Sequence, residues 1–211
     1  MFIKINAKMM ICTLLVFALL TTPVLASDSY VAVKTSKVLA LGENWNVDEA
    51  NAIVASYNED VYIKAWLFYD NQNIYLQYDV YTDFPMANSY TGHDIWKADS
   101  IEFALATNNL VETEKWIIGM TDKDGYQIAT RKPRTLIDVG QGVDVEIGAT
   151  DFGYRAQVIF DLNQASMSKF VPEMSNGLMF SIMVNDSKDG VERTRVIALT
   201  ENVNEPSQHV P

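Results

Sequence analysis

The sequence predicts an all-β protein, a single antiparallel β-sandwich of the jelly-roll type. Three observations lead to this fold class. Hydrophobic residues alternate with polar residues over successive short segments, clusters of Asp, Asn and Gly separate these segments, and only residues 162–170 have a helical pattern. Because alternation at period two places one face of a strand on a core and the other in water, we expect eight or more short strands in two packed sheets.

The first 26 residues have the features of a secretory signal peptide. Lys4 and Lys8 precede an apolar run and a small-residue exit that ends at Ala26. The apolar run is shorter than the roughly 20 residues that span a membrane, so we expect cleavage after Ala26 rather than retention as an anchor. The mature chain, residues 27–211, is then one exported domain, secreted or periplasmic, and is not an integral membrane protein.

Cysteine content and charge limit the chemistry of the mature chain. The only cysteine, Cys12, lies in the signal peptide, so no disulfide is expected and stability depends on a hydrophobic core. Loss of Lys4 and Lys8 changes the net charge from −11 to −13. This acidic balance argues against nucleic acid as a partner and agrees with solubility, with Ca²⁺ or with neutral ligands.

The N-terminal part of the mature chain gives one confident hairpin. Residues 30–34 alternate and 38–41 are apolar, which predicts two short strands. Residues 45–57 are ambiguous, since 48–50 can open one helical turn but nothing sustains it. The strongest alternation spans residues 61–69 and 74–81, with a turn of Asp and Asn residues between them.

A polar loop from residue 82 to 97 follows the hairpin and contains Pro85 and Gly92. Loops of this length in a compact domain are often functional. The loop leads into a strand at 101–105. Further strands are expected at 116–121, 126–130, 143–149, 154–160, 180–185 and 194–199.

Residues 94–103, which read Asp-Ile-Trp-Lys-Ala-Asp-Ser-Ile-Glu-Phe, resemble the D-x-W-x-x-D-S-[VI]-E-[LF] signature of family 9 carbohydrate-binding modules. These modules belong to the wider DOMON-like group of β-sandwiches. Residues 66–76, 153–160 and 180–186 are similar to other segments of the family, in the same order, although Gln157 replaces its usual Glu. The resemblance implies non-catalytic binding of an oligo- or polysaccharide in carbohydrate catabolism, and association with a glycoside hydrolase.

The residues of the signature suit the chemistry of a sugar. A pyranose has an apolar face, which needs a flat aromatic surface, and a rim of hydroxyls, which needs fixed polar groups. Trp96 can supply the surface, and Glu102 should point away from the core because it alternates with Ile101 and Phe103. The resemblance implies the same roles for them. The full set of candidates for ligand binding is Trp96, Glu102, Asn185, Trp116, Lys115 and Asp94.

One feature of the sugar-binding relatives is missing from this sequence. They hold the ring between two Trp side chains, and the second follows the late strand, yet residues 187–200 contain no aromatic residue. Each aromatic face contributes on the order of 1 kcal/mol, so the affinity should be weaker unless another ring replaces it. Trp116 and Tyr90 are the candidates for this replacement.

Two cofactors remain open at the level of the sequence. Family members carry structural Ca²⁺, and oxygen-rich turns here contain Asp122, Asp124, Asp186 and Asp189, although their spacing is not that of a dedicated calcium loop and plain solvated turns are the simpler interpretation. The same group of sandwiches includes haem-binding electron-transfer domains. The available axial ligands are Met86, His93, Met120 and Met183, without a C-x-x-C-H motif.

Beside sugar binding and haem binding, the sequence leaves an enzyme or a structural protein as alternatives. A glycosidase needs two carboxylates across a cleft, and Asp94, Asp99 and Glu102 are candidates only because they are close in sequence. No nucleophile-and-base arrangement and no separate catalytic domain is visible. A structural or protein-binding sandwich of the cell envelope is the third alternative.

Overall fold

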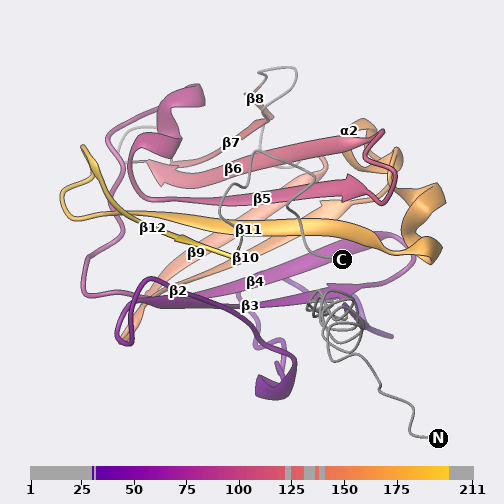
Figure 1. The fold of residues 1–211 in the computed structure, drawn as a ribbon, viewed down its shortest axis with the longest axis horizontal. Helices are drawn as coiled ribbons and strands as arrows, with labels where there is room; N and C mark the ends of the chain where they lie inside the picture. Colours follow the sequence, from indigo (N-terminus) through magenta and orange to yellow (C-terminus); the bar gives the residue numbers. More distant parts are fainter. Residues whose placement is uncertain (1–29, 31, 122–124, 131–135, 138–140, 200–211) are drawn as a thin grey trace, which may run out of the picture.

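The computed structural model describes residues 30, 32–121, 125–130, 136–137 and 141–199, which form two packed β-sheets (Figure 1). Sheet A has the strand order β1-β3-β4-β10-β9, with β2 also paired to β3. Sheet B has the order β12-β11-β5-β6-β7-β8. All neighbours pair in antiparallel fashion except β1, which is parallel to β3. The predicted antiparallel β-sandwich is confirmed.

The strands are short and are joined mostly by tight turns. Sheet A consists of β1 (Val33–Lys34), β2 (Ile53–Ser56), β3 (Tyr62–Tyr69), β4 (Asn73–Tyr81), β9 (Val143–Thr150) and β10 (Gly153–Asp161). Sheet B consists of β5 (Ser100–Thr107), β6 (Thr113–Thr121), β7 (Gly125–Thr130), β8 (Leu136–Ile137), β11 (Leu178–Ser187) and β12 (Arg193–Ala198). The helical segments are η1 (Glu49–Asn51), η2 (Gly92–Lys97), α2 (Ala165–Ser168) and η3 (Val171–Asn176).

One N-terminal prediction is wrong, and the structure resolves one stretch that the sequence left open. The expected strand at 38–41 does not form, because Leu39 and Leu41 pack instead against Trp45 on the outer face of sheet A. The ambiguous stretch 45–57 contains η1 and the edge strand β2. The predicted signal peptide, residues 1–26, lies outside the described residues. Within the part of the chain that is described, no helix is long and apolar enough to cross a membrane.

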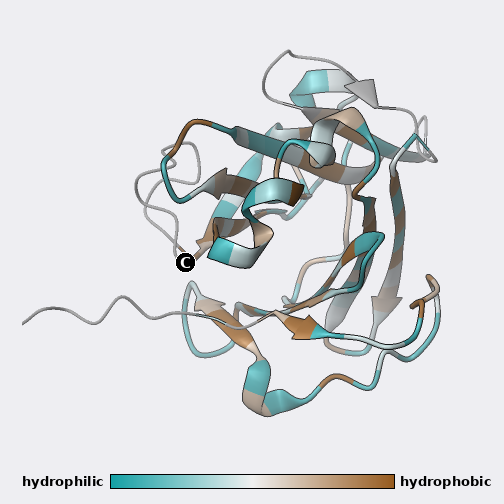
Figure 2. Cartoon of the chain, turned by 90° about the vertical axis from the view of Figure 1, so that its right-hand side faces the viewer, coloured by the Kyte–Doolittle hydropathy of each residue, from teal (hydrophilic) through white to brown (hydrophobic). Residues whose placement is uncertain are grey.

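The main core lies between the two sheets and is built by strand alternation, which Figure 2 shows as bands of hydrophobic and hydrophilic residues along the strands. At its centre Trp116 contacts Phe103 at 6.0 Å and Phe160 at 5.0 Å between ring centroids. All three rings are fully buried. Because successive strand residues point to opposite faces, the sequence neighbours of Phe103 and Trp116 lie on the outer face of sheet B.

A buried carboxylate, that of Asp99, joins the long loop to the hairpin formed by β11 and β12. The Ala87 backbone N–H donates to Asp99 Oδ2 at 2.7 Å, and the Ser187 N–H donates to Oδ1 at 2.8 Å. Nearby, the Ser89 N–H donates to the Gly190 carbonyl at 2.8 Å. Gly190 has φ +73°, and a Cβ there would lie 2.9 Å from the Cβ of Ala87, so only glycine suits this approach.

Burial raises the pKa of Asp99 to about 7 from the ordinary value of 3.8, with Asp186 adding to the rise and the two backbone N–H groups opposing it. The folded protein therefore holds this proton more tightly than the unfolded chain. The contribution of Asp99 to the free energy of unfolding is therefore fully present below about pH 4, and it is lost as the pH rises through 7.

We therefore expect the Asp99 carboxyl carbon to titrate in ¹³C NMR with a midpoint near pH 7. The control is Asp161, whose pKa is lowered, chiefly by the hydrogen bond from the Asn163 backbone N–H. A midpoint for Asp99 at or below that of Asp161 would contradict the buried environment. The stability advantage of the wild type over Asp99→Asn should also be larger at pH 5 than at pH 8.

Trp116 gives a test of the core. Trp116→Ala should lower the free energy of unfolding by about 3–5 kcal/mol, because it leaves a large cavity beside Phe103 and Phe160. Trp116→Phe should cost much less, since it keeps a ring there and removes a buried indole N–H that has no hydrogen-bond partner among the described residues. Urea denaturation followed by circular dichroism measures both, and equal losses would exclude this packing role.

Candidate functional site

The loop helix η2 places Trp96 on the outer side of sheet B. Ile95 is fully buried and packs with Ile117 of β6 and Ala129 of β7. The Asn88 side chain donates to the Ile95 carbonyl at 2.7 Å and to the Asp99 carbonyl at 2.8 Å. With Ile95 held against the sheet, its neighbour Trp96 stays 38% exposed, which is unusual for so large an apolar residue.

The start of η2 is fixed to the same sheet. Gly92 has φ +65°, a left-handed conformation that favours glycine, and its N–H donates to Gln127 Oε1 of β7 at 2.6 Å. The position of Trp96 therefore depends on contacts at both ends of η2 and not on the loop alone.

A polar cluster lies on the outer face of sheet B, on three neighbouring strands. Glu102 of β5 forms an ion pair with Lys115 of β6, and its Oε1 accepts a hydrogen bond from Asn185 Nδ2 of β11 at 2.9 Å. Asn185 Nδ2 also donates to Ser100 Oγ at 2.9 Å. Glu102 and Asn185 are almost fully buried and Lys115 is 8% exposed, so the charges of Glu102 and Lys115 compensate each other away from water.

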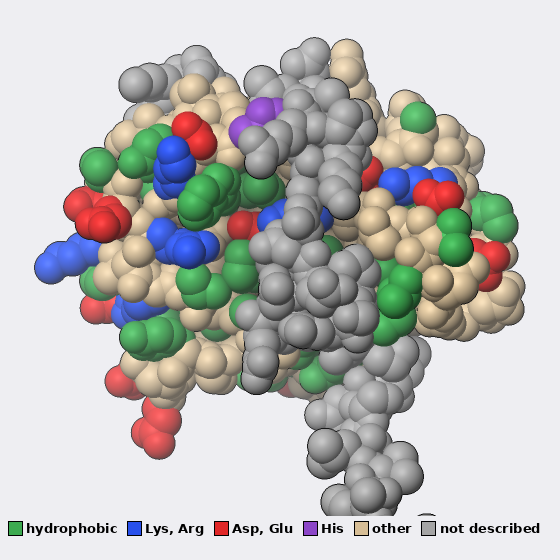
Figure 3. Space-filling view, turned by 45° about the horizontal axis from the view of Figure 1, so that its top comes forward, with side chains coloured by type: hydrophobic (Ala, Val, Ile, Leu, Met, Phe, Trp, Pro, Cys, Tyr) green, Lys and Arg blue, Asp and Glu red, His purple; other side chains and the backbone are tan. Residues whose placement is uncertain are grey.

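Arg193 of β12 connects this cluster to Trp96. Its NH1 donates to Asn185 Oδ1 at 3.0 Å, and its guanidinium carbon lies 5.3 Å from the centroid of the Trp96 ring. Both side chains are exposed, so they form the accessible edge of the cluster. Figure 3, which looks towards this side of the molecule, shows Lys and Arg side chains gathered beside exposed hydrophobic ones.

A β-bulge explains why Arg193 and Arg195 point to different places. The pairing register between β11 and β12 shifts between Asp186 and Ser187. Arg193 consequently reaches the outer-face residue Asn185, whereas Arg195 forms an ion pair with Asp186 at 2.6 Å. Arg195 also pairs with Asp83 of the long loop at 2.9 Å, so its charge is neutralised within the fold.

The structure brings together four of the six candidate residues, Trp96, Glu102, Lys115 and Asn185, and separates the other two. Trp116 lies in the core on the opposite face of β6, so its position does not support a role as the second stacking ring. Asp94 is exposed and pairs with Lys97 at 3.1 Å, apart from the buried cluster. Tyr90, the other ring considered, has the Lys97 ammonium 5.4 Å from its centroid.

Arg193 was not among the sequence candidates. Alternation along 193–198 placed Arg193 and Arg195 on one face, and only the bulge separates them. A usable signal existed, because two Arg residues closely follow the late strand, in the region where the second aromatic was missing.

The calcium candidates are only partly described. Asp122 and Asp124 lie outside the described residues. Asp186 accepts from Arg195 and Thr82, and Asp189 Oδ1 accepts from the backbone N–H groups of Val191 and Glu192. Within the described ranges no three acidic, His or Cys side chains gather as a metal site would require. Protein donors thus already use the carboxylates of Asp186 and Asp189.

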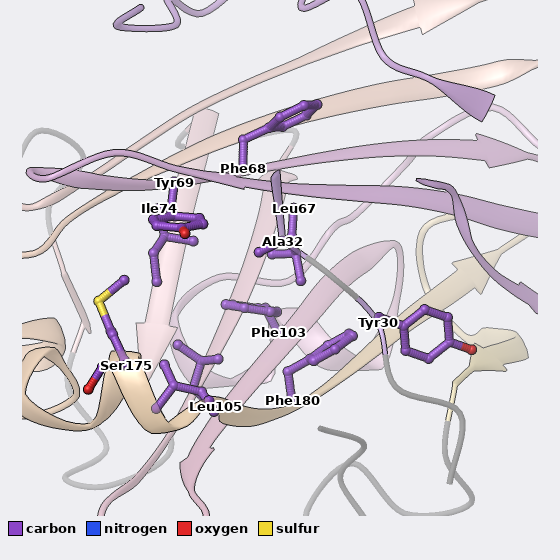
Figure 4. Close-up of a pocket in the computed structure, with 13 residues that line it drawn as sticks. Tyr30, Ala32, Leu67, Phe68, Tyr69, Ile74, Phe103, Leu105, Ser175 and Phe180 are labelled. Atoms are coloured by element: carbon purple, nitrogen blue, oxygen red, sulfur yellow. The ribbon is translucent and has the colours of Figure 1, made fainter. Parts of the chain in front are cut away.

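A separate cavity of about 420 Å³ lies between the sheets, near η3 (Figure 4). It is lined mainly by apolar and aromatic side chains, among them Phe103, Leu105 and Phe180. Such a lining offers little to the hydroxyl rim of a sugar.

The residues of this cavity do not fit haem either. Its lining among the described residues contains Met174, Tyr30 and Tyr69 but no His, Cys or Lys, and none of the four ligands expected from the sequence lines the cavity. Met120 is exposed, and Met183 packs with Ala104 on the outer face of sheet B, away from the inter-sheet space.

Comparisons with known proteins agree with the fold and the signature. The structure is similar to a family 9 carbohydrate-binding module from Caldicellulosiruptor kristjanssonii in complex with glucose, with 18% identity and a TM-score of 0.56 over 86% of this chain and 93% of that chain. The same module in complex with cellotriose gives 18% identity and a TM-score of 0.56 over 86% and 89% of the two chains. No curated protein matches the sequence.

The family model described as "Carbohydrate family 9 binding domain-like" matches residues 42–207. This range contains both sheets from β2 onward, the loop helix η2 and every residue of the polar cluster. The chain belongs to the family 9 carbohydrate-binding domain-like proteins.

Proposed function

We propose that this protein binds a carbohydrate non-covalently on the outer face of sheet B, at the edge formed by Trp96 and Arg193. The observation that carries the proposal is the exposed indole of Trp96 beside a polar cluster. Membership of the family supports it, as do the glucose and cellotriose complexes of the structurally similar modules.

The chemistry of the edge matches a pyranose. The indole of Trp96 offers a flat apolar surface for the C–H face of the ring, and the guanidinium of Arg193 offers hydrogen-bond donors to the rim. Glu102 and Asn185 act from behind this edge, where Asn185 fixes the position of Arg193. Their direct contact with sugar hydroxyls, expected from the family resemblance, stays a prediction.

The wider role that we propose is the capture of oligo- or polysaccharides by an exported protein, in the service of carbohydrate catabolism. The sequence features of a signal peptide at residues 1–26 support export. A glycoside hydrolase is the partner that the family resemblance suggests, because a non-catalytic module increases the local concentration of an enzyme on its substrate.

Trp96→Ala should raise the Kd for a glycan that binds the wild type by about tenfold or more, because it removes the stacking surface. Its stability should change by less than about 1 kcal/mol, since the side chain is exposed. Isothermal titration calorimetry on glycans selected from a neutral and acidic array measures the first effect. Tyr57→Ala, which removes another exposed aromatic, should leave the Kd unchanged, and equal affinities of wild type and Trp96→Ala would refute the proposed site.

Glu102→Gln tests the cluster behind the edge. The amide retains the shape and the acceptor for Asn185 but leaves the buried ammonium of Lys115 without its carboxylate. We expect a loss of about 3 kcal/mol in the free energy of unfolding, measured in urea, together with weaker sugar binding. A free energy of unfolding equal to that of the wild type would show that the ion pair does not contribute to stability.

A further inference from the structure

We propose that the preferred ligand of this site is an acidic sugar, a pyranose that carries a carboxylate, and that Arg193 is the residue that selects it. This inference rests on the proposed carbohydrate-binding function and names the class of sugar. It starts from the charges on the outer face of sheet B.

The charges of the cluster do not cancel. Glu102 and Lys115 form one ion pair, and on η2 Asp94 and Lys97 form another. Arg193 has no carboxylate within ion-pair distance in the described part of the chain, where its partners are the neutral amide oxygen of Asn185 and the ring of Trp96. Among the described residues of this cluster, one positive charge therefore remains in excess, and it lies over the Trp96 ring.

The contrast with Arg195 shows that this excess is local. Arg195 stands two residues further along β12 and has two carboxylate partners, Asp186 and Asp83. The chain as a whole carries a net charge of −11, with more acidic than basic residues. A guanidinium without a carboxylate partner is therefore not explained by an excess of basic residues. Arg193 is exposed, and a ligand can reach it without breaking an ion pair.

The geometry of a guanidinium suits a carboxylate in particular. Arg presents five N–H donors in a planar fork, and within the described residues Arg193 forms one side-chain hydrogen bond, from NH1 to Asn185 Oδ1. A carboxylate can take two parallel hydrogen bonds from such a fork, and charge-assisted bonds of this kind are roughly twice as strong as neutral ones. A uronic acid ring lying against Trp96 can bring its carboxylate to that fork, whereas a neutral sugar offers only hydroxyls.

The test compares uronic acid trisaccharides of the galacto, gluco, manno and gulo configurations with their methyl esters, which keep the shape and remove the charge. We expect at least one acid to bind the wild type ten times or more tightly than its methyl ester and than cellotriose. Arg193→Gln should raise the Kd for that acid at least tenfold. The fold-increase in Kd for its methyl ester should be at least three times smaller than the fold-increase for the acid. The acid should also lose affinity between 50 and 500 mM NaCl more than the ester, because salt screens exposed charges.

The matched control is Lys64→Gln, which removes one positive charge from β3 in sheet A, where Lys64 pairs with Glu49. It should leave the preference for the acid unchanged, which separates a local contact from the field of the whole protein. Circular dichroism and urea denaturation establish that Arg193→Gln is folded.

The outcomes separate this inference from the proposed function. Equal or tighter binding of cellotriose, or of the methyl ester, overturns the acidic preference and leaves sugar binding at Trp96 intact. Preference for an acid that Arg193→Gln does not reduce overturns the role of Arg193. Binding of none of these sugars, acidic or neutral, overturns both, and binding of a sulfated oligosaccharide in place of every uronide overturns the assignment of a carboxylate.

Discussion

The arrangement of the site depends on one buried carboxylate. Asp99 accepts backbone hydrogen bonds from Ala87 in the long loop and from Ser187 at the end of β11, and these two segments lie far apart in the sequence. The first segment leads to Trp96 and the second to Arg193. Because a buried backbone N–H without a partner is costly, loss of this carboxylate would affect both segments together.

The two faces of sheet B differ in character: one is part of the hydrophobic core, and the other carries the polar cluster. Alternation along β5 and β6 sends Phe103 and Trp116 into the core, and Glu102 and Lys115 to the opposite face. The core residues supply the stability of a chain that has no cysteine after residue 12. The outer residues form a compensated polar network that holds the guanidinium of Arg193 in place through Asn185.

The edge formed by Trp96 and Arg193, which we propose as the binding site, differs from a clamp of two aromatic rings. The partner over the Trp96 ring is the guanidinium of Arg193, which combines a planar surface with charge. Such a pair has less apolar area than two indoles. In the site that we propose it would favour a charged ligand group over a neutral one, because charge-assisted hydrogen bonds are stronger.

The sequence by itself determined the sandwich, most of its strands and the signature around Trp96, because alternation at period two and turn chemistry are local properties. It also predicted the outward direction of Glu102, which the hydrogen bond from Asn185 confirms. The strand expected at 38–41 does not form because Leu39 and Leu41 pack on the outer face of sheet A. The sequence did not predict β2, because its pairing with β3 places Ile53 and Ala55 in the core between the sheets.

Only the tertiary structure decided which aromatic and charged residues share the site. Trp116 is of a residue type that commonly stacks on sugars, but the alternation of side chains along β6 directs it into the core. The sequence shows only that Arg193 and a second Arg follow the late strand, and the bulge in the β11–β12 pairing brings Arg193 to Asn185 and Trp96. A one-residue shift of register moves every side chain of a strand to the opposite face of the sheet. Register depends on how two segments pair, so it cannot be predicted from the sequence of either segment alone.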